Sequence, residues 1–182
     1  MNWKLLSSEY LFKDLWFTVR KDACERADGK RIDPYYVYEF PDWVTAVAIT
    51  TEGKFIFERQ YRHALGRTMM EIPGGCVDPE DVSLETAIAR ELKEETGYVF
   101  DSYQYLGKTS ANPSTHNNWM HYFLATGGRA VSGQALDANE EIEIHLLELD
   151  QVKHLLKSGE IIQSMHATAL FHALAHLGHL HY

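Results

Sequence analysis

Three glutamates, Glu91, Glu94 and Glu95, lie within five residues of one another in the segment R-E-L-K-E-E-T. Carboxylates three or four positions apart on a helix repel each other by about 0.2–0.5 kcal/mol per pair when water surrounds them. Against a partly buried surface, two such charges about 6 Å apart repel by roughly 3 kcal/mol at an effective dielectric constant near 20. The spacing therefore has two interpretations: a solvated acidic face, or a site where a cation balances the charge.

The residues around these glutamates predict a helix over residues 84–96. Ser83 is a favourable N-cap residue, and Gly97 is a favourable residue just beyond the C-terminus. One side of the helix carries an apolar stripe formed by Leu84, Ile88 and Leu92. The glutamates flank this stripe, so we expect them at the border of the buried surface and not in open solvent.

Charge balance favours a bound cation over a solvated face. Arg90 can form an ion pair with Glu94 four residues later, but one guanidinium cannot balance three carboxylates. A divalent cation that prefers oxygen ligands can do so, and Mg²⁺, which retains water and phosphate ligands, fits best. A Mg²⁺ site is therefore the favoured interpretation, with the solvated face as its alternative.

The segment from Arg90 to Tyr98, R-E-L-K-E-E-T-G-Y, follows Gly75 and resembles the second half of a known motif. The motif is the Nudix box, G-x5-E-x7-R-E-U-x-E-E-x-G-U, where U is a bulky apolar residue. Every specified position from the arginine onward is matched if Tyr98 counts as apolar. The resemblance implies a Mg²⁺-dependent hydrolase of the Nudix family, and it covers residues 41–182.

The first half of the box departs from the family pattern. Arg90 lies fifteen positions after Gly75, one more than the pattern allows, and Val82 stands where the family has glutamate. That glutamate normally holds the box arginine in place. We expect Asp81 or Glu85 to take over this structural role.

The resemblance implies roles for the residues of the box. Glu91 and Glu95 are expected to bind Mg²⁺, with Mn²⁺ as an alternative, helped by Glu94 and the backbone carbonyl of Gly74. Glycine suits that position because it lets the backbone approach a metal closely. Arg90 completes the catalytic set in a mainly structural role. The attacking group would be a water molecule, which splits the P–O–P linkage.

A general base must lie within hydrogen-bonding distance of the attacking water. The segment L-D-A-N-E-E-I, residues 136–142, is similar to the acidic catalytic loop of the ADP-ribose pyrophosphatase group within the family. Glu140 aligns best as the base and Glu141 is the second candidate. The alternative is a solvated acidic loop without a catalytic role.

Other segments also resemble this group. They are E-R-Q-Y-R at residues 58–62, E-I-P-G-G at residues 71–75, and Pro113 sixteen residues beyond Gly97. The group implies a nucleoside diphosphate sugar as substrate, such as ADP-ribose or GDP-mannose, cleaved to a nucleoside monophosphate and a sugar phosphate. The alternatives are a pyrophosphohydrolase of nucleoside triphosphates or dinucleoside polyphosphates, and a non-catalytic ligand-sensing module.

Several residues outside the box are candidates for substrate binding. Arg62 is the first candidate for a phosphate contact, followed by Arg59 and Arg67, although each could be an exposed charge at a strand end. Glu71 could bind a ribose hydroxyl or a metal-bound water, or be a plain strand-edge residue. Three aromatic residues could stack on a nucleobase, although aromatic residues in strands usually belong to the core: Trp43, Tyr36 and Phe40.

The elements that must position these residues form an α/β pattern. Alternating or continuous apolar runs predict strands at residues 16–24, 35–40, 44–50, 54–62, 68–75, 103–109, 119–126 and 142–149. Helices are predicted at residues 84–96, 150–157 and 161–177. The resemblance implies a Nudix α/β/α sandwich with a mixed sheet at residues 41–182. It also implies an N-terminal antiparallel β extension, residues 1–40, that reaches across a homodimer.

Composition restricts the partners and the compartment. The 182-residue chain has a formal charge of −9 and no dense run of basic residues, which argues against nucleic acid or an anionic membrane as a partner. No uninterrupted apolar stretch has the length of a membrane span. Cys24 and Cys76 form no C-x-x-C pair and are expected to be reduced thiols, which fits a cytoplasmic protein.

Overall fold

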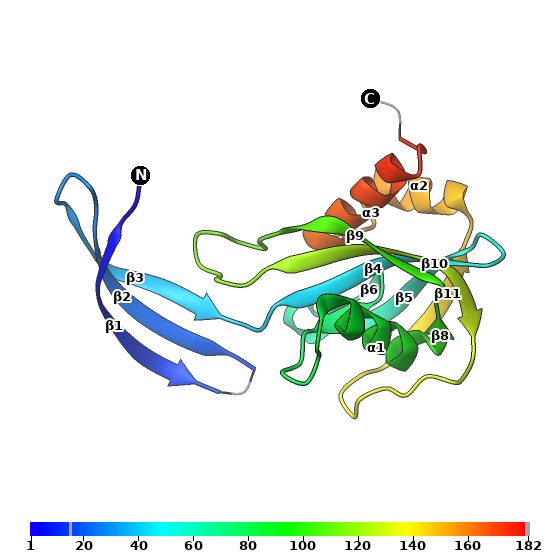
Figure 1. Cartoon of the computed structure of the whole chain (residues 1–182), viewed down its shortest axis with the longest axis horizontal. Coiled ribbons are helices and arrows are strands. Elements are labelled where there is room, and N and C mark those ends of the chain that lie inside the picture. Colours follow the sequence, from blue (N-terminus) through cyan, green and yellow to red (C-terminus); the bar gives the residue numbers. More distant parts are fainter. Residues whose placement is uncertain (15, 181–182) are drawn as a thin grey trace. The chain divides into compact units, whose positions relative to one another are not determined.

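The computed structural model describes residues 1–14 and 16–180, and they form two compact units (Figure 1). The first unit contains residues 1–42 and the loop Ser110–Trp119. The second unit contains residues 43–109 and the described residues from Met120 onward. The loop joins the first unit through backbone hydrogen bonds, including one from the Tyr38 N–H to the Thr115 carbonyl (2.7 Å).

The first unit is a three-stranded antiparallel sheet in the order β1-β2-β3. Its strands are β1 (Lys4–Lys13), β2 (Thr18–Glu25) and β3 (Arg31–Glu39). A turn with Gly29 at φ 78° joins β2 to β3. Strand β1 was not predicted. Two register irregularities, between Leu5 and Ser7 and between Tyr10 and Phe12, interrupt the alternation that identifies a strand in a sequence.

The second unit is built on an eight-stranded mixed sheet. Its central order is β11-β5-β4-β10-β8, with β6 paired to β5, β7 to β4 and β9 to β10. Strands β4 and β10 are parallel, and the other pairs are antiparallel. The strands are β4 (Trp43–Thr50), β5 (Phe55–Arg62), β6 (Arg67–Glu71), β7 (Gly74–Cys76), β8 (Tyr98–Val99), β9 (Ser102–Thr109), β10 (Met120–Ala130) and β11 (Ile142–Leu147).

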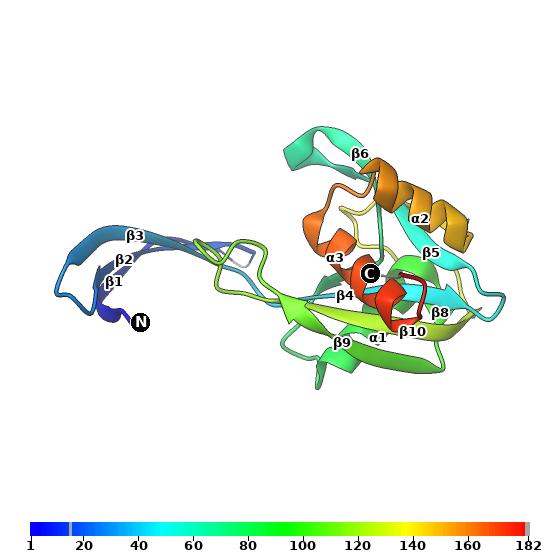
Figure 2. The same ribbon diagram turned by 90° about the horizontal axis from the view of Figure 1, so that it is seen from above.

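Helices cover both faces of this sheet (Figures 1 and 2). Helix α1 (Leu84–Thr96) lies on one face, and α2 (Leu149–Ser158) and α3 (Ser164–His176) lie on the other. A short 3₁₀ helix, η1 (His63–Leu65), connects β5 to β6. The predicted α/β/α sandwich with a mixed sheet is therefore confirmed.

Strand β4 contributes to the cores on both faces, as its apolar sequence predicted. Val47 packs in the core that includes Leu170 and Leu174 of α3. Val44, Ala46 and Ala48 pack in the core that includes Ile88 and Leu92 of α1. Because successive side chains of a strand point to opposite faces, one apolar run supplies both layers.

Strand β10 extends to Ala130, four residues beyond its predicted end at residue 126. The glycines at 127 and 128 indicated a loop, but tertiary pairing continues the strand. Gly128 pairs with Thr50 of β4, and Arg129 and Ala130 pair with β8. Neighbouring strands thus override the local preference of glycine for turns.

Cys24 and Cys76 are both free thiols, as predicted. Within residues 1–14 and 16–180, no helix has the length and apolar character needed to cross a membrane.

Candidate active site

Helix α1 places two of the three predicted glutamates in the protein interior. It begins after Ser83, whose side chain accepts a hydrogen bond from the Thr86 N–H, and it ends at Gly97, as predicted. Glu91 is 9% exposed and Glu95 is 5% exposed, whereas the side chain of Glu94 is 44% exposed. The solvated-face interpretation is therefore wrong for Glu91 and Glu95.

Two glycines of β7 let these carboxylates approach the backbone. Glu95 Oε2 accepts a hydrogen bond from the Gly74 N–H (2.8 Å). Gly74 has φ 147°, and a Cβ there would lie 2.2 Å from the Val44 carbonyl oxygen of β4. At Gly75, a Cβ would lie 2.5 Å from Glu91 Oε1. A larger residue at either position would disrupt β7 pairing or displace the Glu91 carboxylate.

Arg90 connects the helix to the loop that precedes it. Its Nη2 donates to Asp81 Oδ2 and to the Cys76 carbonyl oxygen, both at 2.9 Å. Its Nη1 donates to Glu91 Oε1 and Glu94 Oε2, both at 3.0 Å. The hydrogen bond from Arg90 lowers the pKa of Asp81. Arg90 therefore holds the loop and the helix glutamates in one arrangement.

The departure in the first half of the box has a structural explanation. Val82, at the position of the usual glutamate, is 90% exposed. Asp81, one residue earlier, contacts Arg90 instead, and its Oδ2 also accepts from the Asp78 N–H (2.9 Å). Glu85 lies in the first turn of α1. Of the two expected substitutes, Asp81 holds Arg90, and the longer loop provides the necessary reach.

Glu58 of β5 is a buried carboxylate that was not predicted from the sequence. Its side chain forms a hydrogen bond with Glu95, and the residue is only 3% exposed. Ile56 packs in the core under α1, and Glu58, two residues later, points to the same face of the sheet. This alternation was the available signal, because a charged residue on the buried face of a strand is unusual.

We call Glu58, Glu91 and Glu95 the acidic cluster. Burial raises the pKa of Glu58 to about 8 and the pKa of Glu91 to about 7, and it raises the pKa of Glu95 well above its usual value. The charge of Glu140 adds to each of these increases. The cluster therefore resists ionisation as it stands, and the charge of Glu140 adds to this resistance.

The chemistry of the acidic cluster fits a divalent cation, although its side chains do not surround one point. Among the described residues, no three His, Cys, Asp or Glu side chains are gathered closely enough to hold a metal ion as they stand. The donors are all oxygens, as Mg²⁺ prefers. One of them, Glu58 Oε1, is buried without a hydrogen-bond partner among the described residues. Side-chain rearrangement would therefore have to accompany cation binding.

Arg62 and Glu71 form an ion pair across β5 and β6. Arg62 Nη2 lies 2.6 Å from Glu71 Oε2, and Arg62 Nε donates to both carboxylate oxygens at 3.2 and 3.0 Å. The Glu71 side chain is 3% exposed and that of Arg62 is 47% exposed. Glu71 is thus a buried anchor for Arg62, and not a plain strand-edge residue.

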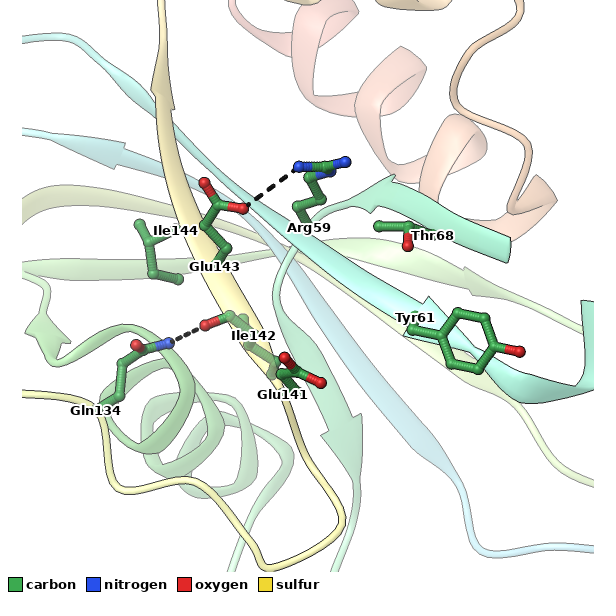
Figure 3. A pocket seen from close by; sticks show the side chains of 8 residues that line it. All are labelled: Arg59, Tyr61, Thr68, Gln134, Glu141, Ile142, Glu143 and Ile144. Atoms are coloured by element: carbon green, nitrogen blue, oxygen red, sulfur yellow. Dashed lines mark hydrogen bonds and ion pairs between the residues drawn. The ribbon is translucent and has the colours of Figure 1, made fainter. Parts of the chain in front are cut away.

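A pocket of about 560 Å³ lies at the edge of the sheet formed by β5 and β11 (Figure 3). Arg59 faces Glu143 across these strands at 3.6 Å. Gln134 Nε2 donates to the carbonyl oxygens of Glu95 (2.7 Å) and Ile142 (3.1 Å), which connects the pocket to α1. The pocket is lined by Arg59, Tyr61, Thr68, Gln134, Glu141, Ile142, Glu143 and Ile144.

The remaining predicted substrate residues lie in different environments. Arg67 is exposed on β6, opposite Arg62 in the strand register. Trp43 is partly buried against the core that contains α3. Tyr36 is 46% exposed on β3 of the first unit. The substrate contacts assigned to these residues stay predictions.

The α/β/α sandwich, with paired glycines facing a helix of the R-E-U-x-E-E type, defines the Nudix class of proteins. Residues 40–166 match the NUDIX domain, and the chain belongs to the Nudix family. Residues 3–38 match the N-terminal domain of nucleoside diphosphate sugar hydrolases. The chain is therefore a Nudix hydrolase of the nucleoside diphosphate sugar group.

Known proteins resemble this chain over nearly its full length. It is 28% identical over 162 residues to the methanol dehydrogenase activator of Bacillus methanolicus, covering 88% of this chain and 86% of that protein. It is 29% identical over 168 residues to the ADP-ribose pyrophosphatase of Bacillus subtilis, covering 92% and 90%. A crystal structure of an ADP compounds hydrolase matches with a TM-score of 0.85 and 25% identity, covering 99% of this chain and 98% of that chain.

Proposed function

We propose that this hydrolase cleaves the diphosphate linkage of nucleoside diphosphate sugars in a Mg²⁺-dependent reaction, releasing a nucleoside monophosphate and a sugar phosphate. The observation that carries the proposal is the buried acidic cluster beside the glycines of β7, in a chain with the N-terminal domain of this group. The relative named ADP-ribose pyrophosphatase makes ADP-ribose the first substrate to test. GDP-mannose, the other sugar nucleotide that the resemblance implies, is the second.

The metal would be held by Glu91 and Glu95, helped by Glu94 and the Gly74 carbonyl, with Mn²⁺ as an alternative to Mg²⁺. When bound, it would polarise a phosphoryl oxygen and acidify the attacking water. The Gly74 N–H donates a hydrogen bond to Glu95, and Arg90 donates hydrogen bonds to Glu91 and Glu94. These hydrogen bonds orient the glutamates of the helix before any metal is bound.

Other residues of the chain would position the substrate and the attacking water. Glu140 is the proposed base, because its charge acts on every member of the acidic cluster. Arg62, held by Glu71, presents a half-exposed guanidinium suited to a phosphate oxygen. Arg59 and Glu141 line the pocket beside β11, which offers space for the part of the substrate beyond the diphosphate.

We also infer a homodimer formed through the first unit, in the cytoplasm. Large apolar side chains exposed close together in a chain are typical of a protein–protein interaction site. The inference is supported by large exposed apolar side chains concentrated near the N-terminus: Trp3, Leu5, Leu6, Tyr10, Leu11, Phe12 and Trp16. The cytoplasmic location is supported by the two free thiols, Cys24 and Cys76.

Chromatographic detection of the products tests the substrate class. Ion-exchange chromatography separates nucleoside monophosphates from the intact substrates and needs no coupling enzyme that a chelator would inactivate. The chain would be assayed with ADP-ribose, GDP-mannose, UDP-glucose, dATP and a dinucleoside polyphosphate, each with Mg²⁺ and with chelator. We expect a sugar nucleotide to be the best substrate and the chelator to abolish turnover. Preference for dATP or the dinucleotide would refute the substrate class.

Glu95→Gln separates loss of chemistry from loss of folding. The amide oxygen can still accept from the Gly74 N–H, and removing a buried charge relieves repulsion within the acidic cluster. We expect at least a hundredfold loss of kcat/KM with an unchanged or higher Tm in the absence of metal. Equal turnover of the variant and the parent would refute the assignment of Glu95 as a metal ligand.

A further inference from the structure

Two glutamates occupy paired positions on β5 and β6 but differ in their hydrogen bonding. Glu58 and Glu71 are opposite each other in the strand register, and each is 3% exposed. Both oxygens of Glu71 accept hydrogen bonds from Arg62. Glu58 Oε1 is equally buried but has no hydrogen-bond partner among the described residues. A structural ion pair therefore explains Glu71 but does not explain Glu58.

The residues around Glu58 indicate which kind of partner its unpaired oxygen could have. Its neighbour on the same face is Glu95, to which its side chain is hydrogen-bonded. Glu71 lies opposite Glu58 in the strand register, so Glu58 has two other buried glutamates as neighbours. Arg62 already gives its N–H groups to Glu71. A carboxyl oxygen that is buried without a partner is costly, and a cation is a partner that would satisfy it.

That partner is available if the cation of the active site lies between Glu58 and Glu95. Glu58 belongs to β5 and Glu95 to α1, so a cation bound by both would join the sheet to the helix. Glu58 lies outside the R-E-U-x-E-E segment, and no part of the box assigns it a role. A core residue of purely structural function at this position would be apolar, like Ile56 two residues earlier.

We propose that Glu58 is an additional ligand of the divalent cation, binding it together with Glu95. The inference rests on the proposed function, because it concerns the same cation. It predicts that the affinity of the free enzyme for metal depends on a residue of β5, in the absence of any substrate.

The test measures Mn²⁺ binding to the full chain by isothermal titration calorimetry without substrate. Glu58→Gln removes the charge and keeps the shape of the side chain, and Glu52→Gln, in the exposed turn before β5, is the matched control. We expect the Kd for Mn²⁺ to rise at least tenfold in Glu58→Gln and to stay unchanged in Glu52→Gln. A Kd within twofold of the parent in Glu58→Gln would overturn the proposal, even if kcat fell.

A second variant and a crystal structure distinguish loss of a metal ligand from a folding defect in Glu58→Gln. Glu58→Asp keeps the carboxylate but shortens its reach, and we expect it to weaken Mn²⁺ binding as well; unchanged affinity would count against the proposal. In a crystal of the parent soaked in Mn²⁺, anomalous scattering should place the cation within coordination distance of the Glu58 carboxylate. A cation bound by Glu91 and Glu95 but not by Glu58 would overturn it.

Failure of this inference can be distinguished from failure of the proposed function. If the parent binds Mn²⁺ and hydrolyses a sugar nucleotide while Glu58→Gln binds Mn²⁺ normally, only the role of Glu58 is refuted. If the parent neither binds Mn²⁺ nor hydrolyses any compound of the panel, the proposed function itself is refuted, and the role of Glu58 with it.

Discussion

Glu140 and Glu141, which are adjacent in the loop before β11, have different surroundings. Glu140 Oε2 accepts from the Asp137 N–H (3.0 Å), and its charge acts on the acidic cluster. Glu141 lines the pocket beside β11. A base must approach the water that attacks the diphosphate, whereas a pocket residue contacts the substrate elsewhere. We therefore retain Glu140 as the proposed base and propose Glu141 for substrate binding.

The comparison of these two residues gives a kinetic prediction. Glu140→Gln should lower kcat by about 10²–10⁴ with little change in KM, because it removes a general base. Glu141→Gln should lower kcat less than tenfold and act mainly on KM. Steady-state kinetics with ADP-ribose measures both parameters. A larger loss of kcat in Glu141→Gln than in Glu140→Gln would reverse the assignment.

At the scale of elements, α1 depends on the loop that precedes it. Asp81 and Asp78 both lie near Arg90, at 2.9 and 3.4 Å, but their side chains are 5% and 49% exposed. A buried, charge-assisted hydrogen bond contributes more to stability than an exposed ion pair. Asp81 is therefore expected to hold Arg90, and through it the glutamates of α1, while Asp78 contributes little.

Paired substitutions in this loop test that difference. Asp81→Asn should lower the free energy of unfolding by about 1.5–3 kcal/mol, and Asp78→Asn by less than about 1 kcal/mol. Urea denaturation followed by circular dichroism measures both changes. We also expect Asp81→Asn to reduce activity, because Arg90 would no longer hold Glu91 firmly. Equal stability of the two variants would contradict this role for Asp81.

At the scale of the whole molecule, pH and metal should act together on stability. Burial raises the pKa of Glu58 to about 8 and of Glu91 to about 7, from an ordinary value of 4.5. These groups ionise first in the unfolded chain, so their contribution to stability decreases as pH rises from about 4.5 to about 8. A divalent cation would offset this loss by balancing the ionised carboxylates.

The combined effect can be measured by thermal unfolding with Mg²⁺ or with chelator. We expect Mg²⁺ to raise Tm clearly at about pH 8 and little at about pH 5, where the cluster is protonated in the folded state and protons compete with the cation. In Glu95→Gln, the increase at the higher pH should be much smaller. An increase of the same size at both pH values would show that the acidic cluster does not bind the cation.

The proposed homodimer is the second prediction at the scale of the whole molecule. Leu5 and Leu11 of β1 are 55% and 49% exposed. Replacing both by serine should convert a dimer to a monomer, because it removes apolar contact area from the proposed interface. Phe171→Ser, which removes an exposed apolar side chain from α3, is the control and should leave the dimer intact. Light scattering after gel filtration measures the mass, and a monomeric parent would refute the dimer.

The sequence by itself determined much of the second unit. Helix α1 has the predicted bounds, because Ser83, Gly97 and the apolar stripe are all local signals. Strand β4 was recognisable because a continuous apolar run needs burial on both faces. The R-E-L-K-E-E segment identified the acid-bearing helix because its spacing lies within a single element.

Only the tertiary structure decided how residues from separate elements meet. It showed that Asp81 and not Glu85 holds Arg90, that Glu71 anchors Arg62, and that Glu58 joins the acidic cluster. It also extended β10 through its glycines by pairing them with neighbouring strands. The physical reason is the same in all of these cases. Hydrogen bonding and burial between distant segments depend on how the elements pack, and the local spacing of residues in the sequence does not determine that packing.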